Sequence, residues 1–130
     1  MTDLFLEKNR KMEIKKHEIN SIKIAEIISN EMIIISAQDG LDLLGNMYYQ
    51  DFDKIIIYEE NITSEFFDLK TKIAGEILQK FSNYRVRLAI IGDFSKYESK
   101  SIKDFIFESN KTRHINFVET LTEALNRLSK

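Results

Sequence analysis

Four side chains that suit acid–base or metal chemistry follow two apolar runs of the chain. Glu59, Glu60 and Asn61 come directly after KIIIY, and Asp93 follows RLAIIG. If these runs are neighbouring parallel strands, their carboxyl ends meet at one edge of a sheet. Carboxylates gathered there raise one another's pKa, act as acid and base, or hold a divalent cation. The alternative is an ordinary solvated edge, and no histidine or cysteine joins the group.

A pair of hydroxyl groups stands in the loop that follows. Thr63 and Ser64 precede a predicted helix, and the free N–H groups and dipole at a helix start stabilise an anion. Either residue is therefore a candidate phosphorylation site. The alternative is that they cap the helix, with a hydroxyl oxygen accepting a hydrogen bond from a first-turn amide.

Two adjacent aromatic residues open the predicted helix. Phe66 and Phe67 on an α-helix cannot both point at the same core, so one of them is a candidate exposed contact for a protein partner or a second copy. The alternative is that a neighbouring helix or the N-terminal arm covers both. The expected contact surface comprises Glu59, Glu60, Asn61, Thr63, Ser64, Phe66, Phe67, Asp68 and Asp93.

A second group of polar residues is expected at the opposite end of the sheet, where strands begin and helices end. Its arginines are suited to binding an anion. The alternative is a network of salt bridges and helix C-caps, with Asn110 in the left-handed conformation. The group comprises Tyr84, Arg85, Glu108, Asn110, Arg113 and His114.

The elements that would position these groups follow from the hydrophobic pattern. Strands alternate with helices, which calls for a parallel sheet with right-handed crossovers, and an initial hairpin turning at Asn20 and Ser21 makes the sheet mixed. We predict an α/β fold of about five strands and four helices in the order ββαβαβαβα. The strands are 12–19, 22–28, 54–60, 85–94 and 114–118, and the helices are 37–49, 66–81, one opening at Ser101 and one following the capping box Thr120–Glu123.

Composition narrows the classes of function. The 130 residues suit one domain, 12–130, preceded by an arm, 1–11. With 19 basic and 21 acidic residues, the net charge of −2 favours neither nucleic acid nor an anionic membrane as a partner. Cysteine is absent and the two histidines show no ligand spacing, so no metal site is expected. No cofactor is expected either, because phosphate-binding glycine loops and nucleophile motifs are missing. The absence of a signal peptide or a long apolar run predicts a cytoplasmic protein.

Two blocks of sequence carry a family resemblance. FFDLKTKIAGEILQKFSNYRVRLAIIGDFSKY and SIKDFIFESNK resemble the bacterial family called domain of unknown function 4180. The order of elements is also similar to the sulfate-transporter and anti-sigma-factor-antagonist (STAS) fold. In anti-sigma antagonists, the loop after the central strand carries Asp-Ser-Ser-Gly with a phosphorylated serine. Here that loop is NITSE followed by Phe66 and Phe67, so the motif is missing.

The sequence thus favours a non-catalytic regulatory or protein-interaction module, with an unidentified protein or a second copy as partner. Two alternatives stay open. One is a small-molecule binder or weak enzyme that uses Glu59, Glu60 and Asp93. The other is a phosphorylation switch at Thr63 or Ser64.

Overall fold

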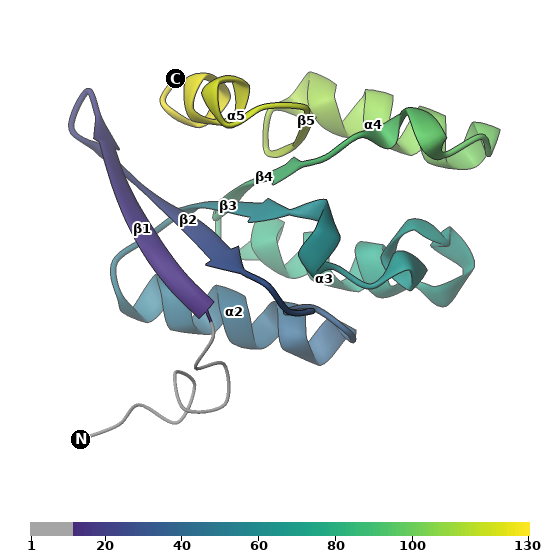
Figure 1. Ribbon diagram of the computed structural model, residues 1–130, viewed down its shortest axis with the longest axis horizontal. Helices are drawn as coiled ribbons and strands as arrows, with labels where there is room; N and C mark the ends of the chain where they lie inside the picture. Colours follow the sequence, from purple (N-terminus) through teal and green to yellow (C-terminus); the bar gives the residue numbers. More distant parts are fainter. Residues whose placement is uncertain (1–11) are drawn as a thin grey trace.

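The computed structural model describes residues 12–130, and the predicted arm, residues 1–11, lies outside them (Figure 1). The elements follow the predicted order. They are β1 (Met12–Ile19), β2 (Ile22–Ser29), α2 (Ala37–Tyr49), β3 (Lys54–Tyr58), α3 (Ile73–Asn83), β4 (Arg87–Ile91), α4 (Lys100–Thr112), β5 (Ile115–Val118) and α5 (Leu121–Leu128). None of these helices is long and apolar enough to cross a membrane.

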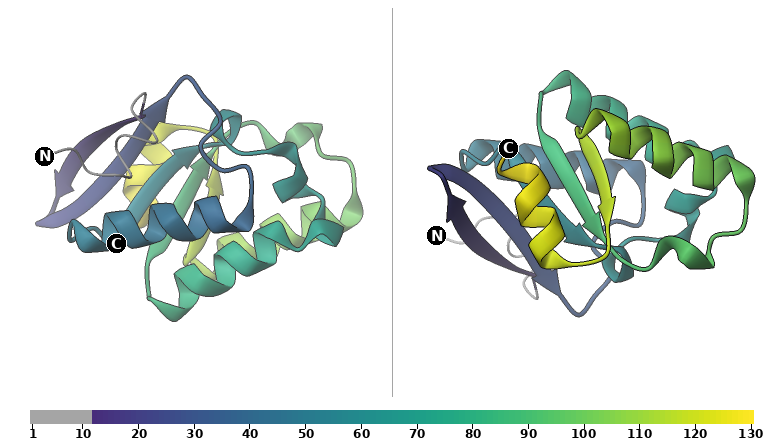
Figure 2. Two further views of the ribbon diagram at one scale, coloured as in Figure 1. Left: turned by 90° about the horizontal axis from the view of Figure 1, so that it is seen from below. Right: turned by 90° about the horizontal axis from the view of Figure 1, so that it is seen from above.

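The five strands form one mixed sheet in the order β1-β2-β3-β4-β5. β1 and β2 are antiparallel, and Asn20 and Ser21 form their turn with φ values of 53° and 68°, as a tight two-residue hairpin requires. β2 to β5 are parallel. Because successive right-handed crossovers advance in one direction, α2, α3 and α4 lie on one face, while α5 lies on the other (Figure 2).

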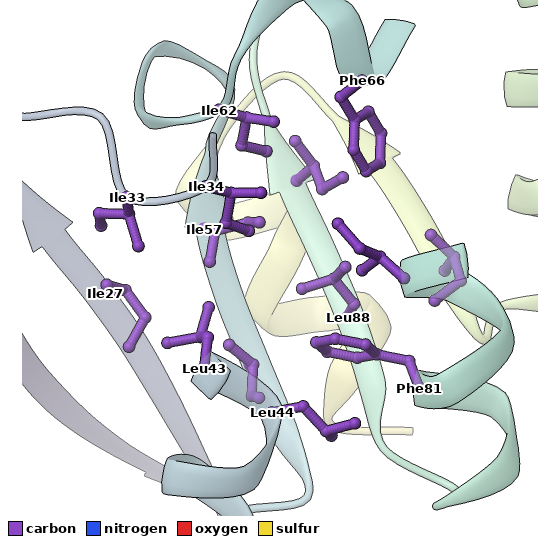
Figure 3. Packing of buried hydrophobic residues seen from close by; sticks show 14 of the residues in the cluster. Ile27, Ile33, Ile34, Leu43, Leu44, Ile57, Ile62, Phe66, Phe81 and Leu88 are labelled. Carbon is purple, nitrogen blue, oxygen red and sulfur yellow. The ribbon is translucent and has the colours of Figure 1, made fainter. Parts of the chain in front are cut away.

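Each face of the sheet has its own apolar core. The larger core lies beneath α2, α3 and α4, where Leu43 and Phe81 meet strand residues such as Ile57 (Figure 3). The smaller core lies beneath α5 and includes Ile56 and Leu128. The run Ile55 to Ile57 is fully buried because its side chains alternate between the two cores, as its continuous apolar sequence predicts.

The helix predicted for 66–81 is wrong in its first half. Residues 64–71 form two 3₁₀ turns, η2 (Ser64–Phe67) and η3 (Leu69–Thr71), and α3 begins at Ile73. Side chains compete with helical hydrogen bonds here: Asp68 accepts from the Lys70 N–H at 3.1 Å, and the Thr71 hydroxyl donates to the Glu65 carbonyl at 2.8 Å. Lys72, at φ 66°, then ends the segment. A three-residue apolar spacing suits a 3₁₀ turn as well as an α-helix, so the periodicity alone misleads.

Candidate functional site

The predicted site lies at the joint between β3 and α3, which we define as residues 59–72. Glu59 begins the 3₁₀ turn η1 (Glu59–Asn61) that follows β3. Its carboxylate accepts a hydrogen bond from the Tyr97 hydroxyl and lies 2.7 Å from the Lys96 ammonium. Burial, followed by this hydrogen bond, raises the pKa of Tyr97. The Glu59 carboxylate is therefore paired with a cation and held in place by a hydrogen bond.

Gly92 makes room for that carboxylate. A Cβ at Gly92 would lie 2.6 Å from the Cβ and from Oε1 of Glu59, so any larger residue would displace the Glu59 side chain. The backbone at the end of β4 and the glutamate at the end of β3 thus pack directly against each other, which fits a structural role for Glu59.

Asn61 fixes the loop between β2 and α2. It is only 2% exposed, and its amide donates to the carbonyls of Ser29 at 3.0 Å and Glu31 at 2.8 Å. The backbone carbonyl of Asn61 accepts from the N–H groups of Ile33 and Ile34. Asn61 is therefore part of the scaffold and does not contribute to the contact surface predicted for it.

Thr63 and Ser64 differ in their surroundings. The Thr63 hydroxyl accepts from the Glu65 N–H at 3.3 Å, so Thr63 caps η2. Capping was the alternative to phosphorylation in the sequence analysis. Its backbone N–H donates to the Ile34 carbonyl at 2.7 Å and joins the joint to the β2–α2 loop. Ser64 is exposed at the start of η2. Phosphorylation of either residue stays a prediction.

Phe66 and Phe67 are both buried, at 1% and 6% exposure, so neither offers an exposed contact. Their rings lie 4.9 Å apart between centroids, and Phe67 stacks on Tyr97 at 4.6 Å. The prediction of a diverging pair assumed an α-helix, whereas the 3₁₀ turn directs both rings into the larger core. The segment after β4, including Phe94, covers Phe67 from outside.

The remaining acids of the predicted site are exposed. Glu60 and Asp68 face solvent at the joint. Asp93 accepts from the Ser95 N–H at 3.0 Å and from the Ser95 hydroxyl at 2.6 Å, and these hydrogen bonds lower its pKa. Because its pKa is lowered, Asp93 is ionised at neutral pH and has no proton to donate, whereas an acid catalyst needs a raised carboxylate pKa. Residues 12–130 contain no cluster of three or more His, Asp or Glu arranged for a metal ion.

The strand order of this sheet differs from that of the α/β sheets that bind ligands in a crevice at the carboxyl edge. In open α/β sheets, ligands bind where the strand order reverses and two loops separate to opposite faces. Here β2 to β5 run in sequence without a reversal, and α2, α3 and α4 share one face. The loops after β3 and β4 therefore stay together, and Tyr97 bridges them through Glu59.

The second predicted group is divided between two places. Tyr84 ends α3 and meets Tyr48 of α2 edge-on, with 5.9 Å between ring centroids. Asn110 lies inside α4 and exchanges two hydrogen bonds with the backbone of Phe117, so its predicted left-handed conformation is wrong. Arg113 holds that conformation instead, at φ 59°.

The other members of this group are spread around the same end of the molecule. Arg85 is exposed in the turn before β4, and His114 is half-buried before β5. Glu108 lies on the surface of α4, where its carboxylate is 3.4 Å from the Lys111 ammonium. Nothing in these contacts brings the two arginines together around a shared anion.

A network around Arg87 was not anticipated from the sequence. The Arg87 guanidinium donates to backbone carbonyls at the ends of α4 and α5, at distances of 2.8 to 3.4 Å. Burial, followed by the charges of Arg113 and Arg127, lowers its pKa. Asn116, fully buried on β5, accepts from Arg127 at 2.7 Å. The sequence did offer a signal for this network, because Arg87 and Asn116 are polar residues in the otherwise apolar strands β4 and β5. The carbonyls that accept from Arg87 are those of Arg113, Arg127, Leu128 and Lys130.

A buried glutamate was also missed. Glu26 on β2 is 3% exposed and lies between His17, whose Nε2 is 2.8 Å from Oε1, and Tyr58, whose hydroxyl donates to Oε2 at 2.7 Å. Burial, followed by the hydrogen bond to Glu26, raises the pKa of Tyr58 to about 12. A charged residue in an otherwise apolar strand is the signal that indicates such a site.

This arrangement predicts a loss of stability at alkaline pH. Because the pKa of Tyr58 is raised above its ordinary 10.0, the folded protein binds the phenolic proton more tightly than the unfolded chain does. The resulting stabilisation is fully present below that ordinary value and is lost as pH rises toward about 12. We expect the free energy of unfolding in urea, measured below and above this pH window, to fall less with pH for Tyr58→Phe than for the unaltered chain. Equal declines in the two proteins would contradict the assignment.

Two exposed apolar residues complete the carboxyl edge of the sheet. Met32 is 47% exposed and Ile35 is 59% exposed, on the loop that Asn61 fixes. The bridge between Ile34 and Ile62 places this loop against the joint (Figure 3). The sequence analysis did not place these two residues at the site, because a run of four apolar residues indicates a buried segment, and Ile33 and Ile34 of the same run are indeed buried.

No curated protein matches the sequence. Among solved structures, the chain is similar to a crystal structure from Thermotoga maritima described as a candidate anti-sigma factor antagonist. The two share 11% identity with a TM-score of 0.47, over 90% of this chain and 95% of that chain. The model of one family matches residues 19–128, which is most of the sequence. The chain belongs to that family, described as Domain of unknown function (DUF4180).

Proposed function

We propose that this chain is a non-catalytic regulatory module that binds a protein partner through the carboxyl edge of its sheet. The observation that carries the proposal is the exposure of Met32 and Ile35 on a fixed loop. Large apolar side chains on a preorganised surface lose little entropy on binding and act as anchors in protein interfaces. The partner-binding surface, which we call the edge surface, comprises Met32, Ile35, Glu60, Thr63 and Ser64.

The charges beside these anchors indicate the character of the partner. Glu60 and Glu65 are exposed, and neither forms an ion pair within residues 12–130. Acidic groups around an apolar anchor favour a partner that presents basic residues around an apolar patch. This surface differs from the one predicted from sequence in two ways. It excludes three residues that are buried, Asn61, Phe66 and Phe67. It includes two exposed apolar residues that were not predicted, Met32 and Ile35.

Quantitative capture from native lysate tests the proposal. The immobilised chain should retain a specific protein, and Ile35→Asp should reduce its retention at least about tenfold, as expected for loss of an anchor residue. Phe107→Asp is the matched control, because Phe107 is 61% exposed on α4, away from the joint. Retention that is equal for Ile35→Asp and the unaltered chain would contradict the proposal.

Solution mass, measured with the same variants, separates a foreign partner from a second copy. A homodimer through the edge surface predicts a doubled mass that Ile35→Asp returns to that of one chain. A dimer that Ile35→Asp leaves intact would place self-association on another surface and would not count for the edge surface.

A further inference from the structure

A groove runs between α2 and α3, toward the ends of both helices and away from the joint. The two helices lie side by side on the same face of the sheet (Figure 2). The groove encloses about 270 Å³ and is lined by Leu41, Leu44, Gly45 and Tyr48 from α2 and by Lys80 and Tyr84 from α3.

One wall of this groove contains a glycine, Gly45, that packing does not require. Gly40 and Gly92 are required by packing, because a Cβ would lie 2.6 Å from the Ile77 side chain in one case and 2.6 Å from that of Glu59 in the other. Gly45, in the interior of α2, has no atom within 4 Å of a built Cβ. A glycine there costs about 0.5–1 kcal/mol relative to alanine and gives no packing in return. A side chain at Gly45 would stand in the groove, so the glycine keeps the groove open.

The walls of the groove are apolar and aromatic. Leu44 belongs to the core beneath the groove, where it lies near Phe81 (Figure 3). The rings of Tyr48 and Tyr84 form an edge-to-face pair at one end of the groove. Both tyrosines are about half exposed, at 53% and 55%. Aromatic walls that lack a packing partner on one side favour a flat apolar body, which contacts the ring faces or edges.

Among the residues of 12–130 that line the groove, Lys80 alone is charged. No carboxylate within residues 12–130 forms an ion pair with it. The charge that complements the groove is therefore a single negative one, placed beside an apolar body.

We propose that the α2–α3 groove binds a small molecule with a flat aromatic body and one carboxylate or similar anionic group. The body lies over Gly45 between Leu41 and Tyr48, and the anion meets the Lys80 ammonium. The volume suits a ligand of one or two rings, since cavities for drug-sized ligands are about 300–1,000 Å³. This site is independent of the edge surface, and either proposal stands if the other fails.

Amide NMR titration with 2-naphthoate and with neutral 2-naphthamide tests the site. Both probes should give saturable shifts confined to residues around the groove. Lys80→Met should weaken naphthoate binding about threefold, as expected for an exposed ion pair, and leave naphthamide binding unchanged. Gly45→Leu should abolish saturable binding of both probes, because leucine keeps the helix and fills the groove.

Gly75→Leu provides the matched control. Gly75 is also helical and also has open space at its Cβ, but it lies on the α3–α4 side of α3, away from Tyr48. This variant should bind both probes as the unaltered chain does. Unfolding curves of both leucine variants should match or exceed that of the unaltered chain, which excludes loss of binding through misfolding.

Three results would overturn the proposal. The first is the absence of saturable shifts at the groove, and the second is unchanged binding by Gly45→Leu. The third is a change of the same amide shifts with protein concentration when no probe is present, because it would assign the groove to a second copy of the chain.

Discussion

Replacing Phe67 by alanine is expected to lower the free energy of unfolding by about 3–5 kcal/mol, the usual cost of removing a buried phenylalanine ring. The ring is 6% exposed and contacts Phe66, Tyr97 and Phe94. Its removal leaves a cavity in the larger core and deprives Tyr97 of the surface on which it stacks. Urea or guanidinium unfolding at equilibrium, followed by circular dichroism, measures the loss.

Phe107→Ala is the control for this prediction. Phe107 is 61% exposed on α4, and its ring faces the Lys111 ammonium at 4.6 Å. Its removal should change stability by no more than about 0.5 kcal/mol, as is usual for surface positions. If Phe67→Ala were as mild as Phe107→Ala, the joint would be a solvent-facing surface and the contact surface predicted from sequence would be restored. A large loss would confirm that Phe67 serves the core and is not available as a contact for a partner.

The sequence predicts this fold where local chemistry decides the structure. Thr120 accepts from the Glu123 N–H at 3.1 Å at the start of α5, as the predicted capping residue does, and α2 begins at Ser36 with a capping box of its own. The run Ile55 to Ile57 is buried on both faces as its composition indicates. These signals act within four residues or through a strict period, so one sequence is sufficient to detect them.

The joint could not be predicted in the same way because its structure depends on partners far along the chain. Tyr97 is 38 residues from Glu59, yet its hydroxyl donates a hydrogen bond to that carboxylate. Asn61 donates to a carbonyl 32 residues earlier. No periodicity reports such contacts, and a carboxylate that serves the fold has the same sequence signature as one that serves catalysis. The exposed acids were therefore predictable as a group, whereas their individual roles were not.

The order of the strands in the sheet could not be predicted from the sequence either. It matters for the proposed function because it decides what kind of site the carboxyl edge can form. The predicted alternation of strands and helices permits both a sequential sheet and a sheet with reversed order. Only the reversed kind provides a crevice at the carboxyl edge. The sequential order found here lacks the reversal that forms such a crevice, so the loops after β3 and β4 stay together beside Glu59 and Asp93.

Arg87→Met should also be strongly destabilising, by about 2–4 kcal/mol, because it leaves several backbone carbonyls at the ends of α4 and α5 without a charged donor. The guanidinium reaches carbonyls 26 to 43 residues away in the chain, so it joins β4 to the C-terminal ends of two helices on opposite faces of the sheet. The cation also lies where the negative ends of both helix dipoles meet. Unfolding in urea measures the loss, and amide hydrogen exchange should increase first in α5.

Two further variants separate the planar donor from the charge. Arg87→Lys keeps the charge, but a single ammonium cannot replace hydrogen bonds donated in several directions by a planar group, so it should recover less than half of the loss. Arg85→Gln removes an exposed arginine two residues earlier, which makes no hydrogen bond to the helix ends, and should change stability by no more than about 0.5 kcal/mol. If Arg87→Lys matched the unaltered chain, charge alone would explain the site. If Arg85→Gln matched Arg87→Met, the loss would reflect the general charge balance of this end of the molecule and not the specific capping of α4 and α5.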